Sequence, residues 1–448
     1  FMKTGRDKYV FLTKAPVSRV ILTMAIPTII SMLITSAYNV ADTYFVGRIN
    51  TQSTAAVGIA FSVMSVVQAV GFFFGHGSGN FMSRSLGARC VRRAQMMATM
   101  GLVLSWMTGC VVAIIGLAFL EPIAIGLGST PTILPYAKDY LGIVLLGAPF
   151  MTTSFTLNNQ MRFQGNAMYA MFGVLSGAVL NILLDPLLIF SFDMGIHGAA
   201  MATLISQVVG FLILFRMSFR GGGVGICLPL FAFRSIFLKE IVFGGTPSLS
   251  RQGLASLSTL ALNVVAGKYG DAAIAAMSIV GRFCFFIFAT IIGFGQGFQP
   301  LCGFCYGAGL YRRVREGFFF CVKYGTIFLS VVAVAGFAFA PEIVREFRND
   351  ATVIDIGTRA LRWQFLTFPL LPLIGLSNMY LQTIRKPLRA NLVAAARSGL
   401  FFIPLIGVLP SLWGVAGLEV CQSASDVCTF ALALPITLHT LSGMKARK

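Results

Sequence analysis

Long apolar stretches alternate with short polar connections along the whole chain. A membrane-spanning helix needs about 20 predominantly apolar residues. The stretches that reach this length cover residues 17–46, 54–82, 95–120, 134–157, 167–190, 195–216, 239–266, 272–302, 317–340, 353–379, 388–408 and 413–438. Gly and Pro interrupt several of them, which bilayer helices tolerate when neighbouring helices satisfy the freed backbone groups. The pattern predicts an all-α integral membrane protein with twelve transmembrane helices.

The two halves of the chain repeat each other at a displacement of 220 residues. Without a gap, Pro27 aligns with Pro247 and the alignment continues to Asn158 and Asn378. The shared motifs include Gly75-x-Gly77 with Gly295-x-Gly297, Arg92-Arg93 with Arg312-Arg313, and Pro149 with Pro369. Duplicated bundles are common among secondary transporters, and their substrate paths lie at the interface between the repeats. We therefore expect two pseudo-symmetric six-helix lobes around a central cleft.

Composition supports the membrane assignment and argues against a nucleic-acid partner. The 448 residues are 56% hydrophobic and only 11% charged, although the net charge is +19. The basic residues lie in short connections between apolar stretches, which is the positive-inside pattern of membrane topology. Of the 34 Lys and Arg residues, 24 fall in the two terminal tails and the even-numbered connections or just inside the adjoining span ends. Both termini are therefore predicted to be cytoplasmic.

Six spans in each half give both halves the same orientation in the membrane. The predicted organisation is an N-lobe over residues 1–216, a cytoplasmic linker over 217–238 and a C-lobe over 239–448. The linker contains Gly221-Gly222-Gly223, but no Gly-Lys-Ser/Thr follows, so it is not a phosphate-binding loop. Because such a loop occurs nowhere in the chain, an ion gradient is the expected energy source.

Neither an enzyme nor a cofactor site is indicated by the remaining residues. The nine cysteines lie in or beside apolar stretches and imply no disulfide framework. The three histidines are scattered without metal-ligand spacing. With no convincing nucleophile and base pair either, we expect no enzymatic activity and no cofactor.

Acidic residues inside the apolar stretches are the first candidates for function. Asp42, Asp185, Glu419 and Asp426 lie within predicted spans. An ionised carboxylate there costs at least a few kcal/mol, so it must face a cavity, pair with a cation or be protonated. In the other half, Leu262 and Leu405 align with Asp42 and Asp185. This acidic pair is therefore particular to the first lobe.

Three polar residues of the first lobe have similar predicted depths. Counting 1.5 Å per residue from the outer ends of their spans, Asp42, Asp185 and Thr203 lie roughly 10 Å below the outer surface. Asn181 precedes Asp185 by four residues and shares its helix face. Such a group could hold a proton or bind Na⁺ through oxygen ligands. The alternative is that these side chains only connect neighbouring helices.

The second lobe carries basic residues near the predicted midplane of the membrane. Arg251, Arg282, Arg362 and Arg397 each lie about ten residues inside a span, and neutral Ser31, Ser62, Gly142 and Gly177 align with them. A buried guanidinium stays charged and must find a carboxylate, carbonyl, water or ligand. Asp426 and Glu419 are the acids available in the last span. The arginines could therefore line the cleft and contact substrate, or form a structural ion-pair network.

Several motifs resemble the multidrug and toxic compound extrusion (MATE) family, in particular the bacterial branch with staphylococcal-type multidrug exporters. They are Asn39-x-x-Asp42-Thr43-x-Phe45-Val46-Gly47, Asn181-x-x-x-Asp185-Pro186, Gly195-x-x-Gly198-Ala199-Ala200-x-Ala202-Thr203 and Gly295-Gln296-Gly297-x-Gln299-Pro300. The resemblance covers essentially the whole chain. It implies a twelve-helix exporter with two lobes, alternating access and H⁺ or Na⁺ antiport. It also implies a cation site at Asp42, Asn181, Asp185 and Thr203, with Asn158 beside it.

The sequence therefore predicts a cation-coupled antiporter that exports amphipathic organic compounds. Its expected partners are a small-molecule substrate and the lipid bilayer of a bacterial inner membrane, in which it works as a monomer. The alternative is a flippase or exporter of anionic or lipid-linked substrates, which the arginines of the second lobe would favour. In that case Arg251, Arg282, Arg362 and Arg397, together with Asp426, would line the substrate cleft.

Overall fold

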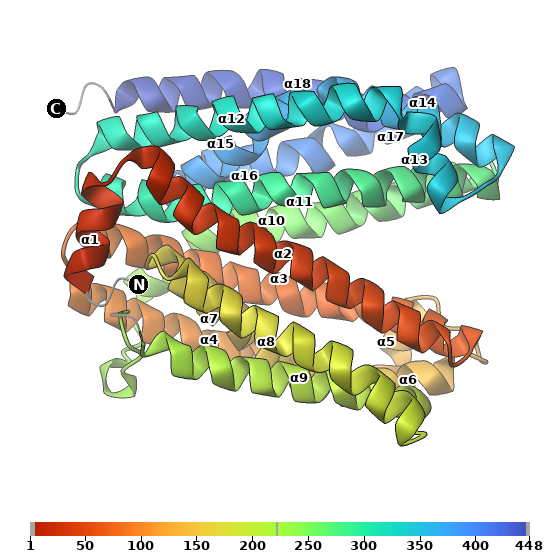
Figure 1. The fold of residues 1–448 in the computed structure, drawn as a ribbon, viewed down its shortest axis with the longest axis horizontal. Helices are drawn as coiled ribbons and strands as arrows, with labels where there is room; N and C mark the ends of the chain where they lie inside the picture. The colour runs from red at the N-terminus through yellow and green to blue at the C-terminus, as the bar shows by residue number, and fades with distance from the viewer. Residues whose placement is uncertain (1–4, 221–222, 445–448) are drawn as a thin grey trace. The chain divides into compact units, whose positions relative to one another are not determined.

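The computed structural model describes residues 5–220 and 223–444, and in them every element is helical (Figure 1). They form two compact units. The first unit contains the chain up to Ala15 together with Ile26–Gly245, and the second contains Pro16–Ala25 together with the chain from Thr246 onward.

The helices that begin in the first half of the chain have the following bounds. They are α1 Gly5–Lys14, α2 Val17–Gly47, α3 Thr51–Gly87, α4 Val91–Ala118, α5 Leu120–Gly126, α6 Leu134–Val144, η1 Leu145–Gly147, α7 Ala148–Phe163, α8 Ala167–Pro186, η2 Leu187–Ser191, α9 Gly195–Ser218 and η3 Leu228–Leu230. Within the first unit, α3 packs against α4 and α7, and α8 packs against α9.

The second half forms a matching series. It consists of α10 Ser235–Gly267, α11 Asp271–Gly307, α12 Tyr311–Ala338, α13 Ala340–Phe347, α14 Ala351–Thr367, η4 Phe368–Leu370, α15 Leu371–Thr383, α16 Pro387–Ala395, η5 Ala396–Leu400, α17 Phe402–Trp413 and α18 Val415–Gly443. After a shift of 220 residues, α11 and α12 have the same bounds as α3 and α4. The repeat in the sequence is therefore a repeat in the structure.

Ten helical segments of the described residues are long and apolar enough to span a bilayer. The other two predicted spans correspond to α10 and to the continuous segment α14–η4–α15. These two are more polar, since α10 carries Arg251 and α14 carries Arg359 and Arg362. The predicted twelve-helix, two-lobe layout is confirmed.

Helices α2 and α10 are each divided between the two units. The part of α2 up to Ala25 belongs to the second unit and its remainder to the first, whereas the part of α10 up to Gly245 belongs to the first unit and its remainder to the second. The changes fall next to Pro27 and Pro247, which lie inside these helices. Proline has no backbone N–H and removes one helical hydrogen bond. A helix can therefore change its packing partner at these points.

The repeated Gly-x-Gly motif makes room for the N-terminal parts of α2 and α10. A Cβ atom on Gly297 would lie within 2.6 Å of the N, Cα and Cβ atoms of Ala25 in α2, and one on Gly77 would collide with the backbone of Ile241 in α10. The preceding glycines, Gly75 and Gly295, pack against Asn159 and Met379, which are themselves repeat-related. The motif is a packing feature of both halves.

We predict that Gly297→Ala lowers the thermal unfolding temperature of the purified protein in detergent. Overpacking costs on the order of 1–3 kcal/mol, which exceeds the gain of up to about 1 kcal/mol that Ala has over Gly inside a helix. Gly253→Ala is the control, because nothing lies within 4 Å of a Cβ atom at Gly253 in α10. If both variants unfolded at the same temperature, the packing argument would be wrong.

Helix α1 precedes the first span and carries a buried lysine. Lys8 is 3% exposed, and its Nζ has no hydrogen-bond partner in the described structure. Burial disfavours the charged form and lowers the pKa of Lys8 to about 8. Leu12 of the same helix is fully buried and packs beside Gly165, which follows α7. Docking of α1 therefore includes the cost of burying a lysine.

The burial of Lys8 predicts that the stability of the folded protein depends on pH. An unperturbed lysine has a pKa of about 10.4, so between about pH 8 and pH 10.4 the unfolded chain binds more protons and stability rises with pH. Lys8→Met should abolish this rise and raise the unfolding temperature at pH 7. Thermal unfolding from pH 7 to pH 10.5 measures both effects, with the exposed Lys14→Met as control. An unchanged slope in Lys8→Met would contradict the assignment.

Candidate ion-coupling site

Four polar side chains predicted to form a cation site come together in the first unit. Asp42 of α2, Asn181 and Asp185 of α8, and Thr203 of α9 are all buried. Asn181 donates from Nδ2 to the Thr203 Oγ1 in a long hydrogen bond of 3.5 Å. Asp42 and Asp185 are near enough to interact electrostatically. Three helices thus contribute to one polar group.

The backbone next to Asp185 departs from regular α-helix. Pro186, the last residue of α8, cannot donate a helical hydrogen bond. The next five residues form the π-helical turn η2, in which Phe192 N bonds to Leu187 O. Turns of this kind are rare and occur frequently at functional sites. The local sequence Asp-Pro therefore places a carboxylate where the helix is already interrupted.

Small residues at the start of α9 let that helix approach η2. A Cβ atom on Gly198 would lie within 3 Å of the backbone of Leu188. Gly195 has a φ of 55°, in the left-handed region that glycine adopts most readily. The close approach of α9 to the end of α8 brings Thr203 beside Asn181.

Two tyrosines complete the group, although the sequence analysis did not select them. Tyr140 of α6 is 4% exposed and has Asp42, Asp185 and Thr203 as neighbours. Tyr38 interacts electrostatically with both aspartates. Tyr38 lies four residues before Asp42, so helical spacing could have identified it. Tyr140 had no comparable signal, because its only link to the site is the packing of α6.

Several acceptor atoms of the group have no hydrogen-bond partner in the described structure. Asp42 Oδ1, Asn181 Oδ1 and both carboxylate oxygens of Asp185 are buried without a hydrogen-bond partner in the described structure. A buried acceptor without a partner costs about 1–3 kcal/mol, and more if it is charged. Two neighbouring carboxylates with free oxygens can share a proton or coordinate Na⁺, which is bound by oxygen ligands. The donor set therefore fits either ion.

Asn158 lies elsewhere. Its Nδ2 donates to the Ala170 carbonyl at 3.1 Å and connects α7 to α8. Ala170 precedes Asp185 by fifteen residues in the same helix, which is about 22 Å along the axis. The repeat-related Asn378 donates to Ala390 in the same way, at 2.8 Å. The expected place of Asn158 beside the cation site is therefore corrected: it makes a bond that belongs to the shared scaffold.

In the second unit, Arg397 forms a closed ion pair. Its Nε donates to Asp426 Oδ1 at 2.8 Å, and its guanidinium lies 4.7 Å from the Phe288 ring centroid. Asp426 is fully buried and also accepts hydrogen bonds from Gln422 and Thr367. Arg397 lies in the π-helical turn η5. The carboxylate and the guanidinium satisfy each other within the protein.

The other three arginines do not join this pair. Arg251 donates to Asn378 Oδ1 at 2.7 Å. Arg362 stacks on Phe337 of α12 with 5.2 Å to the ring centroid, and Arg282 is exposed on α11. Of the four arginines, Arg397 alone forms an ion pair with Asp426 in the described structure.

Glu419 also has a partner that differs from the expected one. It is 2% exposed and pairs with Arg359 of α14, with 3.0 Å between Arg359 Nη2 and Glu419 Oε1. Arg359 additionally contacts Asp355 one turn earlier. The sequence analysis did not single out Arg359, because it lies closer to the end of its predicted span.

The duplicated bundle of apolar helices and its buried acidic group define a polytopic membrane transporter. Comparison with known proteins gives the family. The MatE family profile matches residues 27–187 and again residues 247–407, which reproduces the displacement of 220 residues. The chain belongs to the MATE family of transporters, and the family resemblance of its motifs is confirmed.

Curated relatives and solved structures agree with this assignment. The multidrug export protein MepA of Staphylococcus aureus (strain MRSA252) is 28% identical, and the alignment covers 97% of this chain and 98% of that protein. MepA of Staphylococcus haemolyticus is also 28% identical, over 95% and 94%. The structure of a MATE transporter in its bent conformation matches with a TM-score of 0.92 at 24% identity, covering 98% of both chains. A MOP superfamily transporter from Pyrococcus furiosus, described as having a binding pocket of reversed polarity, matches with a TM-score of 0.91 at 24% identity, covering 97% and 98%.

The Arg397–Asp426 pair predicts a strong effect on stability. Arg397→Met leaves a fully buried carboxylate without its cation, which costs about 3–5 kcal/mol of unfolding free energy. The double variant Arg397→Met with Asp426→Leu should recover most of this loss. Thermal unfolding of the two single variants and the double variant measures the coupling, with Arg282→Gln as the exposed control. Additive effects of the two single substitutions would contradict the pairing.

Proposed function

We propose that this transporter exports amphipathic organic compounds in exchange for H⁺ or Na⁺ entering at the Asp42–Asp185 group. The observation that carries the proposal is the set of buried carboxylate and amide oxygens without partners, contributed by α2 and α8. Intramembrane acids of this kind mark ion pathways by default. The lobe-specific position of the pair supports a coupling role, since the shared scaffold does not need it.

Ion binding would change the balance of forces between α2 and α8. Without a cation, two ionised carboxylates in a low-dielectric site repel each other. A proton or Na⁺ removes that repulsion and can draw Asp42 of α2 toward Asp185 and Asn181 of α8. Because Pro27 already interrupts the hydrogen bonding of α2, this helix can respond by bending or shifting. Such a movement would alternate the access of the cargo site between the two sides of the membrane.

The proposed class of exported compound is inferred from the relatives of this chain. The curated relatives are named as multidrug export proteins, and family membership over most of the chain supports a similar cargo here. The distribution of Lys and Arg supports a cytoplasmic location of both termini. We further propose a bacterial inner membrane, because the curated relatives are bacterial, and a monomeric state. The alternative of anionic or lipid-linked cargo depends on the arginines of the second lobe being available to the substrate. Since Arg397 is neutralised by Asp426 and Arg251 is bonded to Asn378, we do not favour it.

Asp42→Asn and Asp185→Asn should each abolish cargo export in proteoliposomes, on the order of a 100-fold loss of initial rate. The amide keeps the size of the side chain but cannot release a proton or neutralise Na⁺. Counterflow with a panel of cationic, zwitterionic and anionic dyes, under a pH gradient and a Na⁺ gradient imposed separately, identifies both the ion and the cargo.

Asp193→Asn is the matched control for this experiment. Asp193 is exposed at the outer turn, and its φ of 52° is well tolerated by asparagine, so transport should be unchanged. Gradient-driven export at the wild-type rate in both Asp42→Asn and Asp185→Asn would remove the proposed mechanism.

A further inference from the structure

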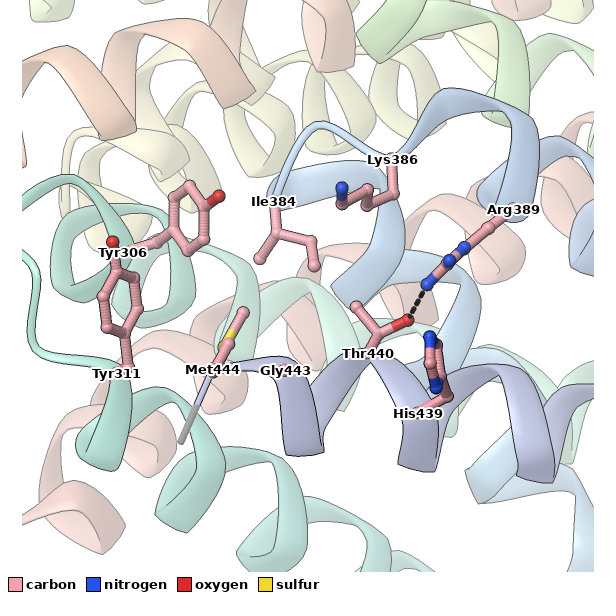
Figure 2. Close-up of a pocket in the computed structure, with 9 residues that line it drawn as sticks. All are labelled: Tyr306, Tyr311, Ile384, Lys386, Arg389, His439, Thr440, Gly443 and Met444. Carbon is pink, nitrogen blue, oxygen red and sulfur yellow. Dashed lines mark hydrogen bonds between the residues drawn. The ribbon is translucent and has the colours of Figure 1, made fainter. Parts of the chain in front are cut away.

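A small cavity lies in the second unit at the end of α11, α15 and α18 that is predicted to be cytoplasmic. Its volume is about 200 Å³. Figure 2 shows Arg389 of α16 reaching toward Thr440 of α18, Lys386 just before α16 pointing toward Ile384, and two tyrosines on another side. The complete lining is Tyr306, Tyr311, Ile384, Lys386, Arg389, His439, Thr440, Gly443 and Met444. The cavity is smaller than the several hundred Å³ of a typical drug-binding pocket.

In the first repeat, residues that follow α9 contact the equivalent place. At the 220-residue displacement, Ile384 and Lys386 correspond to Gln164 and Asn166. There the chain after α9 turns back, Val224 N donates to Gln164 Oε1 at 2.6 Å, and Gly223 lies against Asn166. In the second repeat α18 continues to Gly443 instead of turning back at this point. The surroundings of Lys386 therefore differ from those of the aligned Asn166.

The chemistry of the lining favours an anion. Lys386 and Arg389 supply two permanent positive charges, and His439 supplies a third when it is protonated. None of the nine lining residues that the structure describes is acidic. Arg389 is held in place by its hydrogen bond from Nη1 to Thr440 Oγ1, at 2.8 Å. The residues aligned with Lys386 and Arg389 in the first repeat are neutral Asn166 and Tyr169.

The surroundings of the cavity favour a lipid over a small soluble anion. Leu388, between the two cations in sequence, is 85% exposed, and Leu438, next to His439, is 46% exposed. Apolar side chains this exposed at the end of a membrane helix suit contact with acyl chains. The rings of Tyr306 and Tyr311 lie 5.5 Å apart beside the same cavity, and tyrosine is enriched at membrane interfaces. Basic pockets between transmembrane helices on the cytoplasmic side bind anionic headgroups.

We propose that this cavity binds the phosphate headgroup of an anionic membrane lipid, with Lys386 and Arg389 as the charged contacts. The Tyr306 and Tyr311 rings form another wall of the cavity, and Leu388 and Leu438 contact the acyl chains. The site is separate from the ion-coupling residues of the first unit, and it does not depend on the identity of the exported compound.

Native mass spectrometry of the full-length protein in non-ionic detergent tests the site. The probes are dioleoyl phosphatidylglycerol and, as the zwitterionic comparison, dioleoyl phosphatidylcholine. We expect Lys386→Gln to weaken phosphatidylglycerol binding roughly fivefold, and Lys386→Gln with Arg389→Gln on the order of 25-fold. Binding of phosphatidylcholine should not change. The control is Arg234→Gln with Lys239→Gln, which removes two exposed cations of the linker region.

Two results would overturn the proposal. The first is equal phosphatidylglycerol affinity in the double variant and in the wild type. The second is displacement of the lipid by inorganic phosphate at the same concentration as by dihexanoyl phosphatidylglycerol, which would indicate a free-phosphate site. Unfolding temperatures in lipid-free detergent show that each variant is folded. The single variant keeps the Arg389–Thr440 bond, so its fivefold loss tests charge without disturbing packing.

Discussion

The energy of an ionisable group in hydrocarbon is the constraint on which this structure depends. An unpaired charge at the centre of a bilayer costs several kcal/mol or more, so every such group must be paired, solvated or discharged. The second unit pairs Arg397 with Asp426 and Arg359 with Glu419. The first unit gathers Asp42 and Asp185 without any basic partner among the described residues. The second lobe therefore pairs its two intramembrane acids with arginines, whereas the two acids of the first lobe have no such partner, which supports the proposed binding of an external cation.

In both lobes a charged residue lies where an α-helix is interrupted. Asp185 directly precedes Pro186 and the π-helical turn η2, and Arg397 lies inside the π-helical turn η5. In a π-turn one extra residue is accommodated, which rotates the following side chains and loosens the regular ladder of hydrogen bonds. In an apolar environment this is tolerated only where neighbouring helices or polar side chains satisfy the backbone. The two irregular turns occur at different positions in their repeats, so they arose from the residues of each lobe and not from the shared scaffold.

Much of the fold, and part of the site, followed from the sequence. Apolar length and the 220-residue repeat gave the number of spans and the division into two similar bundles, because both are set by bilayer thickness and by duplication. Depth along each helix placed Asp42, Asp185 and Thr203 at one level, and the structure brings them together. Depth does not specify which way a side chain points around its helix. For that reason the four arginines, which share a level, contact four different surroundings, and Tyr140 could not be recognised before the packing of α6 was known.

The duplication also separates scaffold from function within a single chain. Asn158 and Asn378 each donate a hydrogen bond to the carbonyl twelve residues later. This hydrogen bond is therefore a feature of the fold that both repeats share. The Oδ1 of Asn378 additionally accepts from Arg251, whereas the residue aligned with Arg251 in the first half is Ser31. The two lobes therefore share a framework but differ in their charged residues. The first lobe has acidic residues near the outer side of the membrane, and the second lobe has arginines. A charged residue that occurs in one copy only is not required by the shared framework. Asp42 and Asp185 in the first lobe, and Lys386 and Arg389 in the second, meet this criterion, which supports the proposed ion-coupling and lipid sites.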